Sequence, residues 1–561
     1  MRWQISEVDG DAVARLGREL DIPNIIARLL VLRGITDPET AQRFLHPALY
    51  QLHNPFLLAD MKTAVERLRR ALEHREKILI YGDYDVDGTM AVVILLAALR
   101  GLGGEVEAYI PHRLSDGYGM RAAVMEEAAA KGVRVVVSVD TGIREHEALI
   151  RARELGLDCI VTDHHLPGEN LPPACAILNP QRADSGYPEK VLAGVGVAFK
   201  LVQALLGERL CGRLLQSYLK VVAIGTVADV VPLLGENRVI TRFGLEAFRQ
   251  PSQAGLRALL EVSGLGDRNI SAGDLAFRLA PRLNAAGRMQ DARDVIDLFT
   301  CSDLEKAREI AGRLETLNRD RQRIEDGILR EIAEKMDRQP EKRQHYSIVL
   351  AGEAWHRGVL GIVAQRVVER YHRPALILSV ENGMGVGSGR SIRALHLLDA
   401  LASMQELFVR YGGHARAAGF TLPADRIGEL ETRFEQYARE ILKPIDLEPS
   451  LRVDAEVSGH DIDWTLYEAL ETLAPFGCGN PTPVLAARDL RLVVGPRILQ
   501  EKHLKLRVAR GPRSFDAIGW GMAEQGAMLV AGQTLDLAFT LDQNVFQDTT
   551  TLRLVVSEIR G

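Results

Sequence analysis

The chain has 561 residues, which predicts three or four domains at roughly 100–200 residues each. Hydrophobic residues make up 47% and charged residues 26%, a balance that fits a folded globular protein and excludes extensive disorder. The net charge of -6 neither favours nor excludes nucleic acid, because an acidic metal site and a basic groove can share one chain. No apolar run approaches the ~18 residues of a membrane-spanning helix, and the cysteines form no C-x-x-C pair, so we expect a cytoplasmic protein with reduced thiols and no membrane contact.

Short apolar strands alternate with helices between about residues 76 and 232. The expected strands are 78–80, 106–110, 133–139, 159–161 and 176–178, and the expected helices are 91–102, 120–131 and 145–155. This alternation predicts a parallel sheet that is covered on both faces. All strand C-terminal ends should lie at one edge, because the crossovers are right-handed.

The spacing of apolar residues predicts one long helix over residues 302–336. About 33 residues at ~1.5 Å each would span roughly 50 Å. Such a helix either packs on one domain or connects two domains.

A second α/β region begins at residues 347–350 and runs to about Leu442, after which Pro444 and Pro449 mark a linker. Strand-like runs at 490–494, 504–508, 535–541 and 550–556 then predict a small barrel such as an OB-fold. The expected organisation is an α/β multidomain protein: an N-terminal segment (1–45), a parallel-sheet domain (46–298), a connecting helix (299–343), a second α/β domain (344–443) and a C-terminal OB-like β-barrel (449–561).

Three aspartates alternate directly after the first expected strand: Asp83, Asp85 and Asp87, in the run Asp-Tyr-Asp-Val-Asp-Gly-Thr. In an extended segment their side chains would lie on one side, where carboxylates repel one another unless cations neutralise them. An EF-hand loop also begins D-x-D-x-D-G, but it needs a preceding helix and a Glu at its twelfth position, where this chain has Ile94. We therefore predict a metal site of another kind.

Further acidic and histidine side chains follow later strands. Asp140 ends one strand, Asp163, His164 and His165 follow the next, and Asp229 lies among apolar neighbours. Alone, Asp140 could cap a helix and the histidines could be surface residues. Parallel α/β sheets place their sites just past strand C-terminal ends, and a lone buried Asp is costly unless it is paired or binds a metal. We therefore expect one joint site.

Aspartate and histidine ligands, with oxygen dominant, suit Mn²⁺ or Mg²⁺ better than structural zinc. Two cations a few Å apart are the usual device for phosphodiester hydrolysis: one activates the attacking water, and both neutralise developing charge. We expect two cations per site. No serine or cysteine nucleophile is then required, and the sequence contains no G-x-S-x-G elbow.

These motifs resemble those of the DHH phosphoesterase family, which is named after the Asp-His-His triplet found here at 163–165. The four acidic motifs occur in family order. In addition, Tyr411–Gly419 (YGGHARAAG) resembles the GGHxxAAG motif of the DHH-associated domain. The resemblance implies a DHH domain at 46–298 and a DHH-associated domain at 344–443.

Three further stretches resemble the single-stranded-DNA exonucleases of this family: Asp116–Gly119, Pro281–Arg288 and Pro475–Pro481. The resemblance covers roughly residues 40 to 561. It implies metal-dependent digestion of single-stranded DNA to mononucleotides, from 5′ to 3′, in DNA repair and recombination. Neither spacing nor composition indicates that polarity. A helicase and a single-strand-binding protein are the candidate protein partners.

The expected site roles follow from the acidic motifs and the resemblance together. His165, with Asp163, is expected to be catalytic and to polarise or contact the scissile phosphate. Many small DHH enzymes carry a ligating His just before the first Asp motif, where this chain has Ile80-Tyr81-Gly82, so either Asp87 substitutes or one metal binds weakly. The candidate metal ligands are Asp83, Asp85, Asp87, Asp140, His164 and Asp229.

The run Gly385–Ser391 is interpreted as a glycine-rich turn that ends near an arginine. It fits neither G-x-G-x-x-G nor a P-loop. It is either a plain hairpin turn or a phosphate cradle, in which backbone N–H groups and Ser388 face an anion and Arg390 supplies a bidentate fork.

His414 lies among small residues that would let a DNA backbone approach, although a core histidine is the alternative. Trp355 either stacks a base or packs in a core. Arg113, Arg282 and Arg288 are expected to extend a basic path for the strand. The C-terminal barrel carries further basic residues, which fits an OB-fold that binds single strands.

Two other functions compete with this hypothesis. A DHH phosphodiesterase that acts on short oligonucleotides or cyclic dinucleotides would not need the C-terminal barrel or the long helix. A catalytically inactive scaffold would not need a complete set of repulsive carboxylates. Removal of residues 449–561 is expected to distinguish the exonuclease from the phosphodiesterase, because the activity of a dinucleotide phosphodiesterase should barely change.

Overall fold

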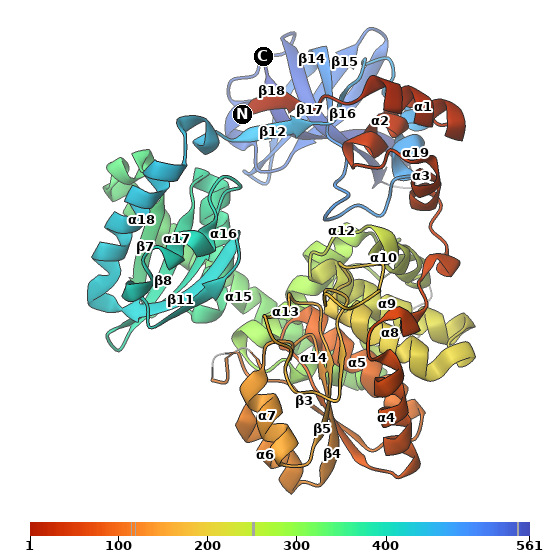
Figure 1. Cartoon of the computed structure of the whole chain (residues 1–561). Helices are drawn as coiled ribbons and strands as arrows, with labels where there is room; N and C mark the ends of the chain where they lie inside the picture. The colour runs from red at the N-terminus through yellow and green to blue at the C-terminus, as the bar shows by residue number, and fades with distance from the viewer. Residues whose placement is uncertain (114, 118, 250–252, 267, 547–548) are drawn as a thin grey trace. The chain divides into compact units, whose positions relative to one another are not determined.

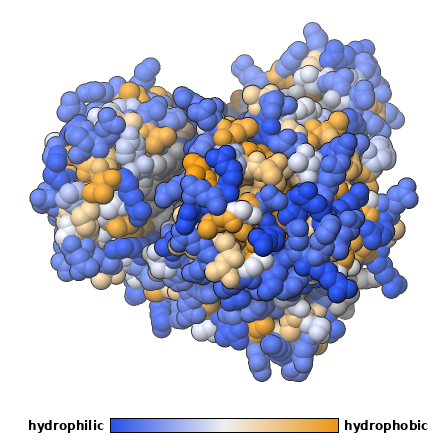
Figure 2. Space-filling model, turned by 60° about the horizontal axis from the view of Figure 1, so that its bottom comes forward, coloured by the Kyte–Doolittle hydropathy of each residue, from blue (hydrophilic) through white to orange (hydrophobic). Residues whose placement is uncertain are grey.

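The structure is a computed structural model that describes residues 1–113, 115–117, 119–249, 253–266, 268–546 and 549–561 (Figure 1). It divides into two compact units. Unit 1 comprises Met1–His53, Val230–Phe243 and Ser450–Gly561, and unit 2 comprises Asn54–Asp229 and Gly244–Pro449. Among the described residues, no helix has both the length and the apolar character that a membrane span requires. The face seen in Figure 2 is largely hydrophilic, and its apolar side chains form small separate groups.

The first sheet of unit 2 is parallel, as predicted. Its strand order is β3-β2-β4-β5-β6, with β2 (Lys77–Tyr81), β3 (Val106–Tyr109), β4 (Val133–Val139), β5 (Asp158–Thr162) and β6 (Ala176–Leu178). Helices α6 (Ala122–Ala130) and α7 (His146–Glu154) cover one face, and α4 (Met61–Glu73), α5 (Val86–Gly101) and α8 (Gly194–Leu206) cover the other (Figure 1). The C-terminal ends of these strands therefore share one edge, where the predicted site residues follow them.

Further helices complete this part of unit 2. They are α9 (Gly212–Ala228), α11 (Ala254–Val262), α12 (Ala272–Asp274), α13 (Ala280–Met289) and α14 (Arg293–Thr300), and α10 (Gly235–Ala247) begins in unit 1. A π-helical turn, Leu275–Leu279, joins α12 to α13.

The long helix α15 spans Leu304–Arg338, close to the prediction. It contacts α11, α13 and α14. Its last turns carry Ile328, Ile332 and Met336 into the core of the second α/β region. The helix therefore does both things that were predicted as alternatives: it packs on the first α/β region and connects that region to the second.

The second sheet of unit 2 is mixed. Its order is β10-β11-β9-β8-β7, formed by β7 (Ile348–Glu353), β8 (Ala375–Glu381), β9 (Met384–Arg390), β10 (Arg410–Gly413) and β11 (Ala417–Pro423). Only β7 and β8 pair in parallel; the other pairs are antiparallel. Helices α16 (Leu360–Tyr371), α17 (Leu397–Ala402) and α18 (Ile427–Ile441) accompany it.

The glycine-rich run is a strand and not a turn, so that prediction was wrong. It forms most of β9, which pairs with β8 on one side and β11 on the other. Its alternate glycines are buried, and a Cβ on Gly387 or Gly389 would meet Phe420 or Leu376. Neighbouring side chains fill the space that apolar residues of β9 would otherwise occupy.

The base-stacking interpretation of Trp355 was also wrong. This side chain is buried in the core of the second α/β region. Its Nε1 donates to Glu331 Oε2 at 2.8 Å, and Lys335 Nζ lies 4.8 Å from the ring centroid. Its aromatic face is therefore engaged within the protein.

Unit 1 contains the predicted OB-like barrel. Strands β14 (Leu485–Leu499), β15 (His503–Arg510), β16 (Arg513–Gly519), β18 (Thr549–Arg560) and β17 (Thr534–Phe546) pair in that order, and β14 pairs with β17 to close it. Strand β13 (Ala455–Glu456) adds to β14, and α19 (Trp464–Glu471) and α20 (Ala523–Gly526) join the strands. Strand β16 was not predicted from the sequence, because it lacks a run of β-branched residues.

The N-terminal segment belongs to the fold of unit 1. Strand β1 (Arg2–Ile5) pairs in parallel with β12 (Ser450–Val453). Helices α1 (Gly10–Leu20), α2 (Asn24–Leu32) and α3 (Pro38–Leu45) follow it. Leu16 and Ile26 of these helices share one core with Leu485 and Leu537 of the barrel.

Candidate active site

The acidic loop after β2 forms a helix start. Asp85 is the N-cap of α5, and its Oδ1 accepts a hydrogen bond from Gly88 N at 3.1 Å. Asp87 therefore lies in the first helical turn, so the predicted extended segment was wrong beyond Asp85. A Cβ on Gly88 would lie 2.8 Å from Asp83 N, so this position requires glycine if the loop is to fold closely over Asp83.

The carboxylate of Asp87 is held by the N-terminus of another helix. Its Oδ2 and Oδ1 accept hydrogen bonds from Gly194 N at 2.6 Å and Val195 N at 2.9 Å, at the start of α8. The partial positive charge of a helix N-terminus stabilises an anion. Burial nevertheless raises the pKa of Asp87 to about 7, and the charge of Asp85 adds to this effect.

Asp140 ends β4 in a left-handed backbone conformation, with φ of 59°. Its backbone N donates to Thr162 O at 2.9 Å. It does not cap α7, which begins at His146 after Glu145, so the helix-cap alternative is excluded. A non-glycine residue in this conformation costs about 1 kcal/mol or more and tends to occur at functional sites.

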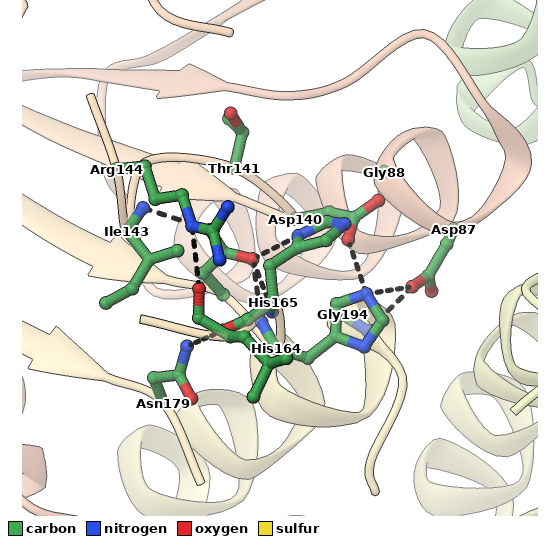
Figure 3. Close-up of polar contacts among 12 residues, drawn as sticks. Asp87, Gly88, Asp140, Thr141, Ile143, Arg144, His164, His165, Asn179 and Gly194 are labelled. Carbon is green, nitrogen blue, oxygen red and sulfur yellow. Dashed lines mark hydrogen bonds and ion pairs between the residues drawn. The ribbon is translucent and has the colours of Figure 1, made fainter. Parts of the chain in front are cut away.

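His164 faces the carboxylates with one defined ring nitrogen. Its Nδ1 lies 3.1 Å from Leu192 O and donates to that carbonyl, which leaves Nε2 without a proton in the neutral ring. Nε2 lies 3.2 Å from Asp140 Oδ1 and 4.0 Å from Asp87 Oδ2 (Figure 3). It also lies 3.7 Å from Asp229 Oδ2. Burial lowers the pKa of His164 to about 4, so the imidazole is neutral and able to ligate a cation.

Asp163 and His165 form a separate pair within the triplet. Asp163 Oδ1 lies 2.7 Å from His165 Nδ1 and accepts from the backbone N of His164 and His165, while its Oδ2 accepts from Ile143 N. Although burial opposes ionisation, the hydrogen bonds from His165 hold the pKa of Asp163 below its ordinary value. The side chain of His165 is 45% exposed, so its ring can reach a bound molecule.

The buried carboxylates are arranged for a cation. In the described chain, Asp83 Oδ1, Asp140 Oδ1 and Asp229 Oδ2 are buried without a hydrogen-bond partner. Burial and neighbouring aspartates raise the pKa values of Asp83 and Asp140 well above normal, and raise that of Asp229 to about 9. Asp140 Oδ1 and His164 Nε2 lie 3.2 Å apart, close enough for one cation to bind both atoms.

Three groups of side chains could each hold an ion, because their ligand atoms lie within 4.8 Å of one another. Asp140 belongs to two of these groups, and so does His164. Carboxylate oxygens with imidazole nitrogen fit Mn²⁺ or Mg²⁺. The groups are Asp140, His164 and His165; Asp87, His164 and Asp229; and Asp83, Asp85 and Asp140.

A cavity of about 300 Å³ opens beside the acidic cluster. The guanidinium of Arg113 lies 5.0 Å from the ring centroid of Tyr84. Burial and the charge of Arg113 lower the pKa of Arg288 to about 10. The lining residues are Asp83, Tyr84, Asp85, Val86, Asp87, Arg113, Ala228, Asp229, Asn284 and Arg288.

Two polar residues of the cavity, Tyr84 and Asn284, were not predicted as site residues, although both lie in sequence motifs described above. Tyr84 stands between the first two aspartates. Asn284 precedes Arg288 by four residues on α13, so the helical spacing could have placed it on the same face.

Arg282, which was predicted to extend the basic path, is not among the residues that line this cavity. Its Nε pairs with Glu315 of α15 at 2.7 Å, and both side chains are 16% exposed. Its Nη1 also donates to Arg278 O. Arg282 therefore joins two helices within unit 2.

Ser388 and Arg390 lie on β9, which pairs with β8 and β11. The backbone N–H groups of this strand are therefore used in the sheet and do not form the expected phosphate cradle. Arg390 Nη1 donates to Gly389 O at 2.8 Å and lies 3.3 Å from Ser388 Oγ. Burial, with the nearby charge of Arg113, lowers the pKa of Arg390. Arg113, Arg288 and Arg390 thus form one basic cluster.

His414 is exposed at the tip of the β10–β11 hairpin, which excludes the core alternative. Its backbone N donates to Ala417 O at 2.8 Å. A Cβ on Gly412 or Gly419 would meet no described atom within 4 Å, so the hairpin presents open backbone.

The Asp116–Gly119 motif lies in part outside the described residues, because Tyr118 is not described. Asp116 Oδ2 accepts from His112 N at 2.8 Å, and Gly119 O accepts from Tyr81 Oη at 3.0 Å. These contacts tie the segment after β3 back onto β2.

A parallel sheet whose strand ends carry buried carboxylates and histidines, beside clustered arginines, defines a metal-dependent phosphoesterase of the DHH class. Models of three families match the chain: DHH family, N-terminal domain (77–226), DHHA1 domain (344–440) and RecJ OB domain (453–558). The chain is 38% identical to the single-stranded-DNA-specific exonuclease RecJ of Dickeya dadantii, in an alignment that covers 96% of each protein. It therefore belongs to the RecJ family.

Solved structures agree with this assignment. The crystal structure of RecJ in complex with Mn²⁺ from Thermus thermophilus is similar with a TM-score of 0.84 and 30% identity, over 100% of this chain and 79% of that one. The corresponding complex with Mg²⁺ has a TM-score of 0.79 and 28% identity, over 100% and 78%. The RecJ of Thermus thermophilus has thus been solved with divalent cations of both kinds.

Proposed function

We propose that this protein is a metal-dependent exonuclease that degrades single-stranded DNA to mononucleotides from the 5′ end, in DNA repair and recombination. The observation that carries the proposal is the set of buried carboxylate oxygens without hydrogen bonds beside an arginine-lined cavity, in a chain of the RecJ family. The polarity rests on the family resemblance.

The proposed cofactor is a pair of Mn²⁺ or Mg²⁺ ions. When bound, they supply positive charge to the phosphoryl transition state and acidify water. Asp163 is proposed to orient His165, whose exposed ring then faces the scissile phosphate. The proposed ligands are Asp83, Asp85, Asp87, Asp140, His164 and Asp229.

The substrate contacts are proposed to come from both α/β regions of unit 2. Arg113 and Arg288 would bind phosphates next to the acidic cluster. Ser388 and Arg390 would bind the 5′ end, and His414 would contact the backbone over the open glycines of its hairpin. The OB-like barrel supports a preference for long single strands over dinucleotides.

The cellular setting is part of the proposal. Single-stranded DNA has to be produced by unwinding and is normally covered, so a helicase and a single-strand-binding protein are the proposed partners. The proposed place of action is the cytoplasm, where the DNA of bacterial relatives lies.

The decisive experiment uses an oligonucleotide of about 30 residues, labelled at either end, with Mn²⁺. We expect stepwise release of mononucleotides from the 5′ end of the single strand, and much slower attack on duplex DNA and on RNA. Asp140→Asn is the matched inactive control. Cleavage of dinucleotides or cyclic dinucleotides without attack on the strand would instead support the small-substrate alternative.

A further inference from the structure

The side chain of Phe277 is 82% exposed on the helical segment that lines the cavity. Single exposed apolar residues are ordinary on protein surfaces and need no function. The backbone around Phe277 and its position relative to the cavity distinguish it from such residues.

The backbone at Phe277 is reshaped by a proline. Pro281 lacks the N–H that would donate to the carbonyl of Phe277 four residues earlier, and its ring would clash with that carbonyl in a regular helix. The chain instead forms the π-helical turn Leu275–Leu279, in which Ala280 N donates to Leu275 O. Single π-turns of this kind occur often at functional sites.

Phe277 lies on the cavity face of this segment. Leu275, Leu279 and Leu283 are buried on the opposite face. Asn284 and Arg288 are likewise not buried with these leucines, so they and Phe277 lie on the side of the segment that faces away from the leucines. Asn284 and Arg288 line the cavity, so Phe277 stands on the same face about 16 Å from Arg288 along the helix.

The two ends of this face differ. At one end, Arg288 Nη1 donates to Gly358 O at 3.3 Å, and Gly361, three residues later, lies beneath Arg390 and Ser388. These are the residues that we assign to the 5′ end of the strand. Phe277 is at the other end, so a strand anchored at Arg390 would run past the acidic cluster toward it.

We propose that Phe277 stacks on a base of the bound strand, on the 3′ side of the scissile phosphate. The inference rests on the proposed function and deepens it. Aromatic side chains stack on any base, so the contact holds the strand without sequence preference. In a duplex the base faces are covered by neighbouring pairs, so this contact also favours single strands over duplex DNA.

The test compares Phe277→Ala and Phe277→Tyr with Phe56→Ala, which removes a 51% exposed phenylalanine of the same unit that does not line the cavity. The measurement is the Kd for a phosphorothioate strand of about 20 nucleotides. We expect Phe277→Ala to raise Kd about five- to hundredfold, the range for loss of one stacked base, whereas the other two variants stay within about twofold of wild type.

A series of strands with one abasic site at successive positions locates the contact. Removal of the stacked base should weaken wild-type binding and add no further loss in Phe277→Ala. A wild-type Kd for Phe277→Ala, or an equal abasic penalty in both proteins, would overturn the inference. Failure of the proposed function is distinguishable, because wild-type protein would then fail to bind or degrade the strand at all.

Discussion

The three residues of the Asp-His-His triplet have different surroundings. His164 turns Nε2 toward the carboxylates, and His165 is partly exposed. Asp163 is buried and accepts four hydrogen bonds, from three backbone amides and the His165 ring. Such a carboxylate fixes the loop and the tautomer of its partner, and it has little capacity left to ligate a metal itself.

Replacing Asp163 with asparagine should therefore act through His165. An amide side chain presents one acceptor oxygen in place of two, so the hydrogen-bond set around His165 cannot be kept. We expect Asp163→Asn to lower kcat on single strands by about 10- to 100-fold, the usual cost of losing an orienting partner, with Mn²⁺ affinity within a few-fold of wild type. Enzyme kinetics beside a Mn²⁺ titration measure this, and a loss of Mn²⁺ affinity equal to the loss of kcat would contradict the orienting role.

Arg390 and Arg282 offer a matched pair of charge deletions. Arg390 belongs to the basic cluster with Arg113, whereas Arg282 is paired with Glu315. We expect Arg390→Ala to raise the Kd for a single strand about tenfold or more, as the loss of a charged hydrogen bond implies, and to reduce the salt dependence of binding. Arg282→Ala should leave Kd nearly unchanged, although it removes the same charge. Equal Kd values for the two variants would remove Arg390 from the binding surface.

The metal-free acidic cluster should make stability depend on pH. The pKa of Asp87 is about 7 and that of Asp229 about 9, both raised chiefly by burial. These groups bind protons more tightly in the folded than in the unfolded chain, so their contribution to stability is present at acid pH and is lost as pH rises through about 7 and then about 9.

Bound cations replace those protons. We therefore expect Mn²⁺ to raise Tm more at pH 8 than at pH 6, and Asp140→Asn to reduce that difference. Thermal unfolding with Mn²⁺ and with a chelator, at both pH values, measures it. An equal rise of Tm at the two pH values would show that these carboxylates do not bind the metal.

At the scale of elements, strand β9 depends on side chains supplied by its neighbours. A methyl group on Gly387 would clash with the ring of Phe420, which is buried. Gly419 on the adjacent strand β11 faces open space. A side chain at Gly387 would therefore clash with the core, whereas a side chain at Gly419 would have room.

We expect Gly387→Ala to lower the free energy of unfolding by about 1–3 kcal/mol, the usual cost of an overpacked core. Gly419→Ala should change that free energy by less than about 1 kcal/mol, since a methyl group there meets no described atom. Urea unfolding of both variants measures the difference. Equal midpoints would mean that Phe420 moves aside without cost.

At the scale of the whole molecule, the barrel is not an independent appendage. Segments from both ends of the chain build one core in unit 1. The buried guanidinium of Arg238 donates to the carbonyls of Phe44, Leu473 and Ala474, and so joins three segments of the chain. Asn480 donates to Leu473 O and Pro475 O, which makes the Pro475–Pro481 motif part of this junction.

The removal of residues 449–561 is therefore a poor test of substrate class. We expect the truncated chain to expose the apolar faces of α1 and α2, to bind a hydrophobic dye and to lose soluble yield. Dye fluorescence and size-exclusion chromatography against the full chain measure this. A monodisperse truncated protein with an unchanged Tm would show that the N-terminal helices fold without the barrel.

Much of the fold and the acidic cluster could be predicted from the sequence, because the relevant signals are local. Each strand of the parallel sheet is a short apolar run, and parallel topology alone brings the strand ends together. Asp83, Asp140 and His164 could thus be assigned to one site before any contact was known. The long helix α15 could be predicted for the same reason, since its apolar residues recur at helical spacing.

Tertiary structure alone decided the features that depend on distant partners. Strand β9 has almost no apolar residues of its own, and Phe420 and Leu376 supply its packing. The ion pair between Arg282 and Glu315 also depends on the fold, because the two residues belong to different helices. Asp163 becomes an orienting group because three amides and His165 converge on it. The spacing of apolar residues determines the secondary structure of a segment. Burial and charge pairing depend instead on which distant residues the fold brings together.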